Sequence, residues 1–297
     1  MVPRAVKLLI GFFIVAVLLV VAALIFALSQ PPPAPPPLPK PNGYDDLVRA
    51  SQMLADKTSD YAAMDEAELR SLVVTNAEAL KLARTGLSHP CQVPLDYSAA
   101  SPTYLFTNLG GLKRLAQGLA AEGRLMELEG RPNDAAGSYL TVIRLGVVTS
   151  KGGLLIDSLV GIAIEAIGTS YLEKLPRTLD ARQCRQAAAV LESCEAGREP
   201  ASAILARERE WSRRAFRGLR WQIVRLVMFK STRQSEQRAV AKLNTLYTRE
   251  QALLIQLASR AYELEKGERP KGLADLVPAY LKTIPQDPVT RTNIAYP

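Results

Sequence analysis

Histidine is nearly absent from this 297-residue chain, in which His89 is the only one. A single histidine excludes zinc sites that need two, such as the HExxH motif, and the paired Glu-x-x-His ligands of di-iron helical bundles. The chain also lacks a CxxC pair, a Walker loop and a GxGxxG motif. We therefore expect no metal, no cofactor and no catalytic residues, and we expect a protein without enzymatic activity.

Cysteine is also scarce, with three residues in the chain. Cys184 and Cys194 lie ten residues apart in one helical pattern, which places them about 15 Å apart and beyond the ~7 Å limit for a disulfide. Cys91 could pair with either one, which would leave one thiol unpaired. A catalytic pair of Cys91 and His89 would need the two side chains to face each other across Pro90. Nothing in the sequence requires this, so a hydrolase with unrecognised residues is kept only as an alternative.

Residues that favour strands are few, because aromatic residues make up 6% of the chain and β-branched runs are scarce after the first thirty residues. Alanine, leucine, glutamate and arginine dominate, and apolar residues recur at helical spacing. We expect an all-α fold, either an antiparallel bundle or a short solenoid similar to tetratricopeptide (TPR) repeats. Helices are expected over 44–56, 65–87, 103–129, from Pro132 onward, and over 153–174, 180–196, 200–230 and 234–266. The expected domains are an anchor (1–29), a proline-rich linker (30–43), a helical domain (44–267) and an irregular tail (268–297).

A long hydrophobic run occurs once without interruption by charge. Leu8 to Leu28 spans 21 uncharged residues, which at ~1.5 Å per residue reaches about 30 Å, the thickness of the hydrocarbon core. Arg4 and Lys7 precede it, so the positive-inside rule places the N-terminus in the cytoplasm. We expect a single-pass protein of the bacterial inner membrane that contacts the bilayer through residues 8–28 and has an extracytoplasmic body.

Two other interpretations of this run involve cleavage. Ala27-Leu28-Ser29 would serve as a signal-peptide site, but the apolar stretch is longer than the ~7–15 residues usual in such signals. Gly11-Phe12-Phe13 is similar to the junction of a type IV pilin leader, yet Ala16 stands where that family has glutamate. We favour the uncleaved anchor.

Proline is concentrated next to this run, where eight of the eleven residues from Pro31 to Pro41 are proline. Such a segment adopts a polyproline II helix with a rise of ~3.1 Å per residue, which gives a semi-rigid reach of about 35 Å. A PxxP ligand for an aromatic groove is the alternative. Because the segment directly follows the expected anchor, we interpret it as a spacer between the membrane and the body.

A narrow polar stripe lies on an otherwise apolar helix over residues 154–167. Its members fall within about 80° of one another on a helical projection; they are Asp157, Gly161, Glu165 and Gly168. One interpretation is a carboxylate pair that binds a cation. The interpretation that we favour is structural: the glycines admit a neighbouring helix, and the acids pair with arginines such as Arg124 or Arg144.

The formal charge of +8 belongs to one segment, since residues 207–242 contain eleven basic and three acidic residues. Treated as one helix, this segment has an apolar face and a basic face. The expected interaction surface comprises Arg209, Trp211, Arg213, Arg214, Arg217, Arg220 and Trp221. It would suit an anionic membrane or an acidic partner, and a solvated face without a partner is the alternative. Nucleic acid is not expected in this compartment.

The end of the chain, "LVPAYLKTIPQDPVTRTNIAYP", resembles the C-terminal segment of type II secretion major pseudopilins. The resemblance implies a component of a secretion or pilus-like apparatus. No acidic residue follows Asp287, so a calcium site is not implied. We expect Leu273, Leu276, Tyr280 and Leu281 to hold the tail against the last long helix.

The middle of the chain, including "LMELEGRPNDAAGSYLTVIRLG", is similar to an uncharacterised family of bacterial membrane-anchored helical proteins, which implies no activity. Taken together, the anchor, the spacer and the helix pairs predict an extracytoplasmic scaffold for protein interactions. Its expected partner is another envelope protein. The sequence leaves the oligomeric state open.

Overall fold

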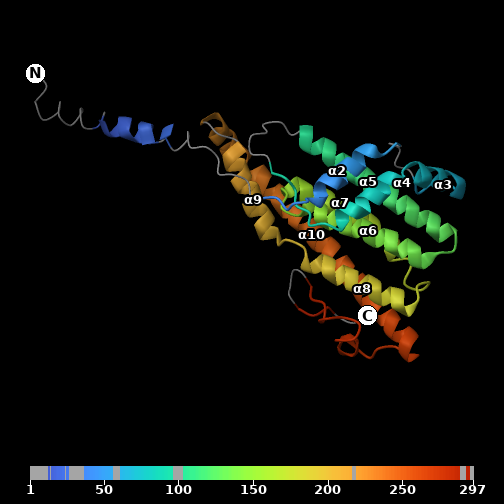
Figure 1. Ribbon diagram of the computed structural model, residues 1–297. Helices are drawn as coiled ribbons and strands as arrows, with labels where there is room; N and C mark the ends of the chain where they lie inside the picture. Colours follow the sequence, from blue (N-terminus) through green and yellow to red (C-terminus); the bar gives the residue numbers. More distant parts are fainter. Residues whose placement is uncertain are drawn as a thin grey trace, which may run out of the picture.

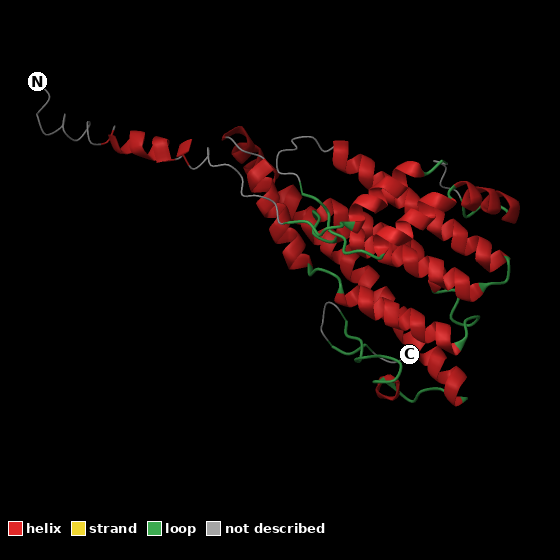
Figure 2. Ribbon diagram, viewed as in Figure 1, coloured by secondary structure: helices red, strands yellow, loops and turns green. Residues whose placement is uncertain are grey.

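The computed structural model describes residues 13, 15–23, 25–26, 37–55, 61–95, 103–215, 219–287 and 292–294, and within these the side chains of 103–107 and 213–233 are excluded. Helices dominate this part of the chain (Figures 1 and 2), and its only extended pairing is an isolated antiparallel bridge between Gln286 and Asn293. The expected all-α fold is confirmed for these residues.

The first layer of the body contains three short helices, α2 (Gly43–Met53), α3 (Glu66–Thr75) and α4 (Ala77–Leu87). The expectation of one helix over 65–87 is wrong, because Asn76 interrupts it with φ −102° and ψ 9°. The buried side chain of Asn76 accepts a hydrogen bond from the Ala55 N–H at 2.9 Å and donates to the Leu72 carbonyl at 2.9 Å. A contact with the end of α2 therefore ends α3.

The middle layer consists of α5 (Thr103–Leu128), α6 (Pro132–Ser150) and α7 (Leu155–Leu172). Gly130 closes α5 with φ +71° and Pro132 occupies the first turn of α6, as the sequence predicted. The backbones of α6 and α7 approach closely: a Cβ on Gly161 would lie 2.7 Å from the Gly146 carbonyl oxygen, and one on Gly168 would lie 2.6 Å from that of Tyr139. Glycine at these positions permits the crossing.

The third layer is formed by α8 (Ala181–Ala196), α9 (Ala201–Ala215) and α10 (Leu219–Lys266). The expected helices 200–230 and 234–266 are wrong in their boundary, because α9 ends at residue 215 and α10 runs without a break through 230–234. Arg209 on α9 pairs with Glu236 on α10 at 2.9 Å. In one straight helix these residues would lie about 40 Å apart, so the chain must reverse between α9 and α10.

The C-terminal tail returns to the body after α10, as expected. Its 3₁₀ helix η1 (Leu273–Leu276) contacts α10. The Tyr280 hydroxyl donates to the Glu265 carboxylate at 2.9 Å, and its ring lies 5.5 Å from that of Tyr262. The Lys282 N–H donates to Glu192 of α8 at 2.7 Å. Leu276 and Leu281 are buried at 0% and 1% exposure, so apolar packing holds the tail on α8 and α10.

The core runs through all three layers. Layer one packs on α5, α5 packs on α6 and α7, and α8 and α10 close the other side. The largest fully buried side chains are Tyr139, Leu47, Leu69, Leu80, Leu112, Leu115, Leu119, Ile143, Leu145, Ile164, Leu172 and Leu253. The described N-terminal residues 13, 15–23 and 25–26 are helical, and their large apolar side chains are exposed.

Candidate functional site

The predicted polar stripe lies on α7, and all four of its members are buried: Asp157, Gly161, Glu165 and Gly168. Both glycines face α6, which fits the structural interpretation. Glu165 pairs with an arginine as expected, but the partner is Arg198. The two arginines named as examples contact other groups: Arg124 lies 3.8 Å from Glu127, and Arg144 donates to the Leu87 carbonyl at 3.0 Å. Glu165 meets Arg198 of the α8–α9 connection, whereas Asp157 accepts a hydrogen bond at the start of its own helix.

Glu165 belongs to a buried ionic cluster formed by three segments. Arg198, in the α8–α9 connection, bridges Glu165 of α7 and Glu250 of α10. The Arg198 Nε donates to Glu165 Oε2 at 3.1 Å, and its Nη2 donates to a carboxylate oxygen of both acids. The three side chains are only 9%, 3% and 4% exposed in the order Arg198, Glu165 and Glu250. The cluster joins α7, the α8–α9 connection and α10.

Two neutral side chains complete this cluster. The Thr169 hydroxyl donates to Glu250 Oε1 at 3.2 Å. The Arg198 guanidinium carbon lies 4.6 Å from the centroid of the Tyr247 ring, in a cation–π arrangement. The guanidinium therefore contacts two carboxylates and one aromatic face, a geometry that lysine would not reproduce.

Burial changes the acidity of this cluster. Desolvation raises the pKa of Glu165 to about 7 and raises the pKa of Glu250, although Arg198 acts in the opposite direction on both. Burial lowers the pKa of Arg198, but attraction to the two carboxylates outweighs it, so the guanidinium stays charged. With both carboxylates ionised the cluster would hold two negative charges and one positive charge, and one proton would neutralise it.

Asp157 lies at the other end of α7, beside the α6–α7 turn. Its Oδ2 accepts a hydrogen bond from the Leu154 N–H at 2.7 Å, whereas its buried Oδ1 has no hydrogen-bond partner. Burial raises the pKa of Asp157 to about 6. Two groups of α9 also hold this turn: Glu208 accepts from the Leu155 N–H at 2.9 Å, and Arg207 donates to the Gly153 carbonyl at 2.7 Å. The start of α7 is thus tied to α9 through polar contacts.

His89 and Cys91 do not form a catalytic pair in this geometry. The Cys91 thiol donates to the backbone carbonyls of Gly86 at 3.5 Å and His89 at 3.4 Å. The His89 Nδ1 lies 3.9 Å from Asp46 Oδ2. Burial raises the pKa of Cys91 to about 11, which is the opposite of the activation that a thiol nucleophile needs. All three cysteines are free, buried thiols.

The basic segment is divided between two helices, so the single two-faced helix that we expected for it is wrong. Arg209 is paired with Glu236, and its side chain is 62% exposed. Trp211 lies on α9 and is half-buried. Arg213, Arg214, Arg217, Arg220 and Trp221 fall outside the side chains that the structure describes.

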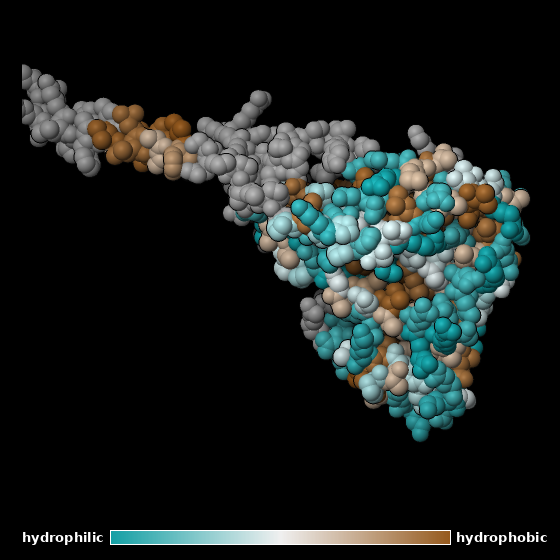
Figure 3. Space-filling view, in the orientation of Figure 1, coloured by the Kyte–Doolittle hydropathy of each residue, from teal (hydrophilic) through white to brown (hydrophobic). Residues whose placement is uncertain are grey.

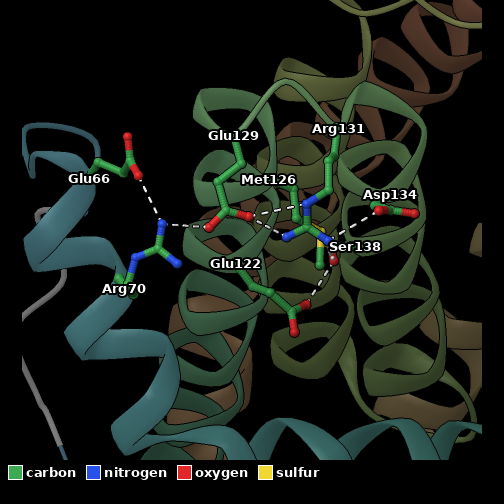
Figure 4. Close-up of polar contacts among 8 residues, drawn as sticks. All are labelled: Glu66, Arg70, Glu122, Met126, Glu129, Arg131, Asp134 and Ser138. Atoms are coloured by element: carbon green, nitrogen blue, oxygen red, sulfur yellow. Dashed lines mark hydrogen bonds and ion pairs between the residues drawn. The ribbon is translucent and has the colours of Figure 1, made fainter.

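A surface ion network connects the first two layers (Figure 4). Arg70 of α3 lies 2.8 Å from both Glu66 and Glu129, and Glu129 also pairs with Arg131, which reaches Asp134 at 3.2 Å. Beside it, the Ser138 hydroxyl donates to Glu122 at 2.7 Å and lies 3.7 Å from the Met126 sulfur. An open hollow on α3 is lined by Glu66, Ala67, Arg70, Ser71 and Val74. Within the described residues, no group of three potential metal ligands occurs.

Comparison with protein-family models, with curated proteins and with solved structures yields no match for this chain. Among the described residues, α7 is the one helix long and apolar enough to cross a membrane by length and composition. It packs against α5, α6, α9 and α10. We therefore interpret α7 as a core helix of the body.

Sequence reasoning found Glu165 but missed Arg198 and Glu250, its ionic partners. The signal for Glu250 was present: it stands at helical spacing within the apolar positions Leu243, Leu246, Leu253 and Leu257 of α10, all of which are buried. A charged residue on an apolar face predicts a buried partner. Arg198 had no such signal, because it lies in a connection between two helices.

Proposed function

We propose that this protein is a single-pass, membrane-anchored helical scaffold whose body lies outside the cytoplasm and binds another envelope protein. The observation that carries the anchor is the exposed apolar surface of the N-terminal helix, which stands out in Figure 3. Its exposed large side chains are Phe13, Val15, Val17, Leu18, Leu19, Val20, Val21, Ile25 and Phe26. Burying each such side chain is worth about 1.5–3 kcal/mol, so a helix of this kind requires an apolar surrounding.

The linker supports the separation of body and bilayer in this proposal. Eight of the eleven residues from Pro31 to Pro41 are proline. Proline lacks the backbone N–H that a helix or sheet needs, so a sequence of this composition favours a semi-rigid polyproline II conformation. It would hold the body away from the lipid headgroups. The two basic residues before the apolar run favour a cytoplasmic N-terminus.

The body supports a scaffold role through its helix pairs. The α5–α6 turn joins two helices that pack along one another, and α6 continues into α7 by a second turn. Consecutive packed helix pairs of this kind support our proposal of a short TPR-like solenoid. Tyr139 lies buried between these helices and stacks on Tyr171 with ring centroids 5.0 Å apart. Such layers present stable outer faces to a partner.

Membrane anchoring is tested by placing a charge on the apolar run. Leu19→Arg should shift the full-length protein out of the carbonate-resistant membrane fraction, because arginine at a helix centre costs about 2.5–3.5 kcal/mol of insertion. The matched control is Val74→Arg, because Val74 is 71% exposed on the body and Leu19 is 66% exposed. The control should stay in the membrane. Wild-type protein that is extracted without detergent would refute the anchor.

Sidedness is tested with single introduced cysteines, because the native thiols are buried at 0–6% exposure and serve as a low background. Ser71→Cys lies on the exposed surface of α3 and should react with a membrane-impermeant maleimide in spheroplasts. Val2→Cys should react only after the membrane is permeabilised. The reverse pattern would place the body in the cytoplasm.

The partner is sought by crosslinking intact cells and purifying the protein in detergent. Recovery of one defined envelope protein, lost on competition with the purified body, would support the scaffold. Recovery of pseudopilins, or N-terminal processing at Gly11, would instead favour a component of a secretion apparatus. Repeated recovery of no partner would contradict both.

A further inference from the structure

The buried ionic cluster holds an unequal number of charges. Glu165 and Glu250 contribute two carboxylates and Arg198 contributes one guanidinium, and none of them is more than 9% exposed. Burying an uncompensated charge is expensive, and a buried group takes up a proton when this restores neutrality. A proton shared by the two carboxylates would leave the cluster neutral with its hydrogen bonds intact.

Other titratable groups face the cluster from the neighbouring helices. Cys194 of α8 lies close enough to interact with Arg198, Glu165 and Glu250, and burial raises the pKa of its thiol to about 12. Burial also raises the pKa of Tyr247 on α10. Both groups therefore stay neutral below pH 8.

Two charged neighbours complete this environment. Glu195 of α8 adds negative charge near Glu250 and makes a second ionised carboxylate there less favourable. Arg144 of α6 acts on Cys194, and its guanidinium donates to the Leu87 carbonyl. Within the part of the chain that the structure describes, the guanidinium of Arg198 is the cation that directly contacts both carboxylates.

We propose that Glu165, Arg198 and Glu250 form a proton-dependent latch, which holds the α8–α9 connection and α10 against α7 while one proton is bound and loosens when both carboxylates ionise. The three residues come from three segments, so the latch closes a tertiary contact and not a local one. Binding or release of one proton changes the net charge of the three side chains by one unit, between neutral and −1.

Arg198 of the latch lies shortly before the basic segment 207–242 in the sequence. Arg198 is three residues before α9, and α9 has one buried apolar side chain, Ile204, among its described residues. Polar contacts also attach α9 to the body, including Arg207 to Glu199 and Glu208 to the Leu155 N–H, and its Leu205 and Trp211 side chains are half-buried. Loosening of Arg198 would therefore weaken the attachment of α9, which carries the start of the basic segment (residues 207–215). The exposure of this segment to the pH outside the cell depends on the proposed extracytoplasmic location of the body. The response of the latch to pH does not depend on that location.

Hydrogen exchange of the purified full-length protein in detergent tests the latch, with mass-spectrometric readout between pH 5 and pH 8 and correction for intrinsic exchange rates. In the wild type, protection of 197–201 and of α10 around Glu250 should fall as the pH rises, by at most about tenfold per pH unit for one proton. Glu165→Gln and Glu250→Gln each remove the need for the proton, so each should remove this pH dependence.

A matched control is available at the end of α7 and on α10. Glu173, the residue that follows α7, pairs with Arg249 of α10 at the surface, with 27% and 45% exposure, and Glu173→Gln should keep the wild-type pH dependence. The double variant Glu165→Gln/Glu250→Gln leaves Arg198 without an anion and should lose protection at every pH. The comparison is repeated in an Asp157→Asn background, because Asp157 titrates in the same direction.

Two outcomes would overturn the latch. One is a wild-type protein whose protection at 197–201 is unchanged or rises between pH 5 and pH 8. The other is retention of the full pH dependence in both single variants. Either result is obtained on purified protein, so it leaves the proposed membrane location untouched.

Discussion

Replacing Gly161 by alanine should weaken the contact between α6 and α7, although alanine favours a helix. An added Cβ would lie 2.7 Å from the Gly146 carbonyl oxygen and 3.2 Å from the Ser150 Cβ. The first contact involves backbone on the facing helix, so relief requires the two helices to move apart. Gly137 of α6 provides a control, because it is exposed and its added Cβ would meet nothing within 4 Å.

The expected magnitudes have opposite signs. Alanine in place of glycine within a helix stabilises by about 0.5–1 kcal/mol, and Gly137→Ala should show this gain. Overpacking of a filled interior costs about 1–3 kcal/mol, so Gly161→Ala should lose about 1 kcal/mol net. The two variants should then differ by about 2 kcal/mol in the free energy of unfolding.

Urea unfolding followed by circular dichroism at 222 nm measures both variants in the same detergent. The denaturant midpoint should move in opposite directions for the two variants, with the same slope of free energy against urea concentration. Equal stability of Gly161→Ala and Gly137→Ala would refute the close packing of α6 on α7.

Three further predictions concern the cluster, the start of α7 and the tail. Arg198→Met should lower the free energy of unfolding by about 3–5 kcal/mol, because two carboxylates lose their buried cation. Arg198→Lys keeps a positive charge and should lower the free energy of unfolding by a smaller amount. Urea unfolding measures both variants. Burial raises the pKa of Asp157 to about 6, so the folded protein holds this proton more tightly than the unfolded chain does. The stabilisation from this proton is fully present below pH ~3.9 and is lost as the pH rises through about 6. Asp157→Asn should flatten this part of the dependence of the free energy of unfolding on pH. Leu281→Ala should cost about 2–5 kcal/mol and expose the tail to limited proteolysis, whereas Tyr280→Phe should cost only about 1 kcal/mol through its lost hydrogen bond to Glu265.

The limits of most helices follow from local signals in the sequence. Gly130 and Pro132 mark the end of α5 and the start of α6, and Asp180 caps α8 by accepting a hydrogen bond from the Gln183 N–H at 2.7 Å. Apolar spacing also identified the tail residues that dock on α10. Helix hydrogen bonds and caps join residues four or fewer positions apart, and such short-range order is readable from a single sequence.

Tertiary structure decided the features that depend on distant partners. Asn76 ends α3 because Ala55, 21 residues away, supplies a donor for its side chain. Arg209 meets Glu236 because the chain reverses between α9 and α10. Arg198 joins acids that lie 33 and 52 residues away, and their separation in sequence carries no information about their approach in space. The sequence by itself determined which faces are apolar, and packing of those faces determined which buried charges meet, because a charge removed from water must find its partner wherever the fold brings one.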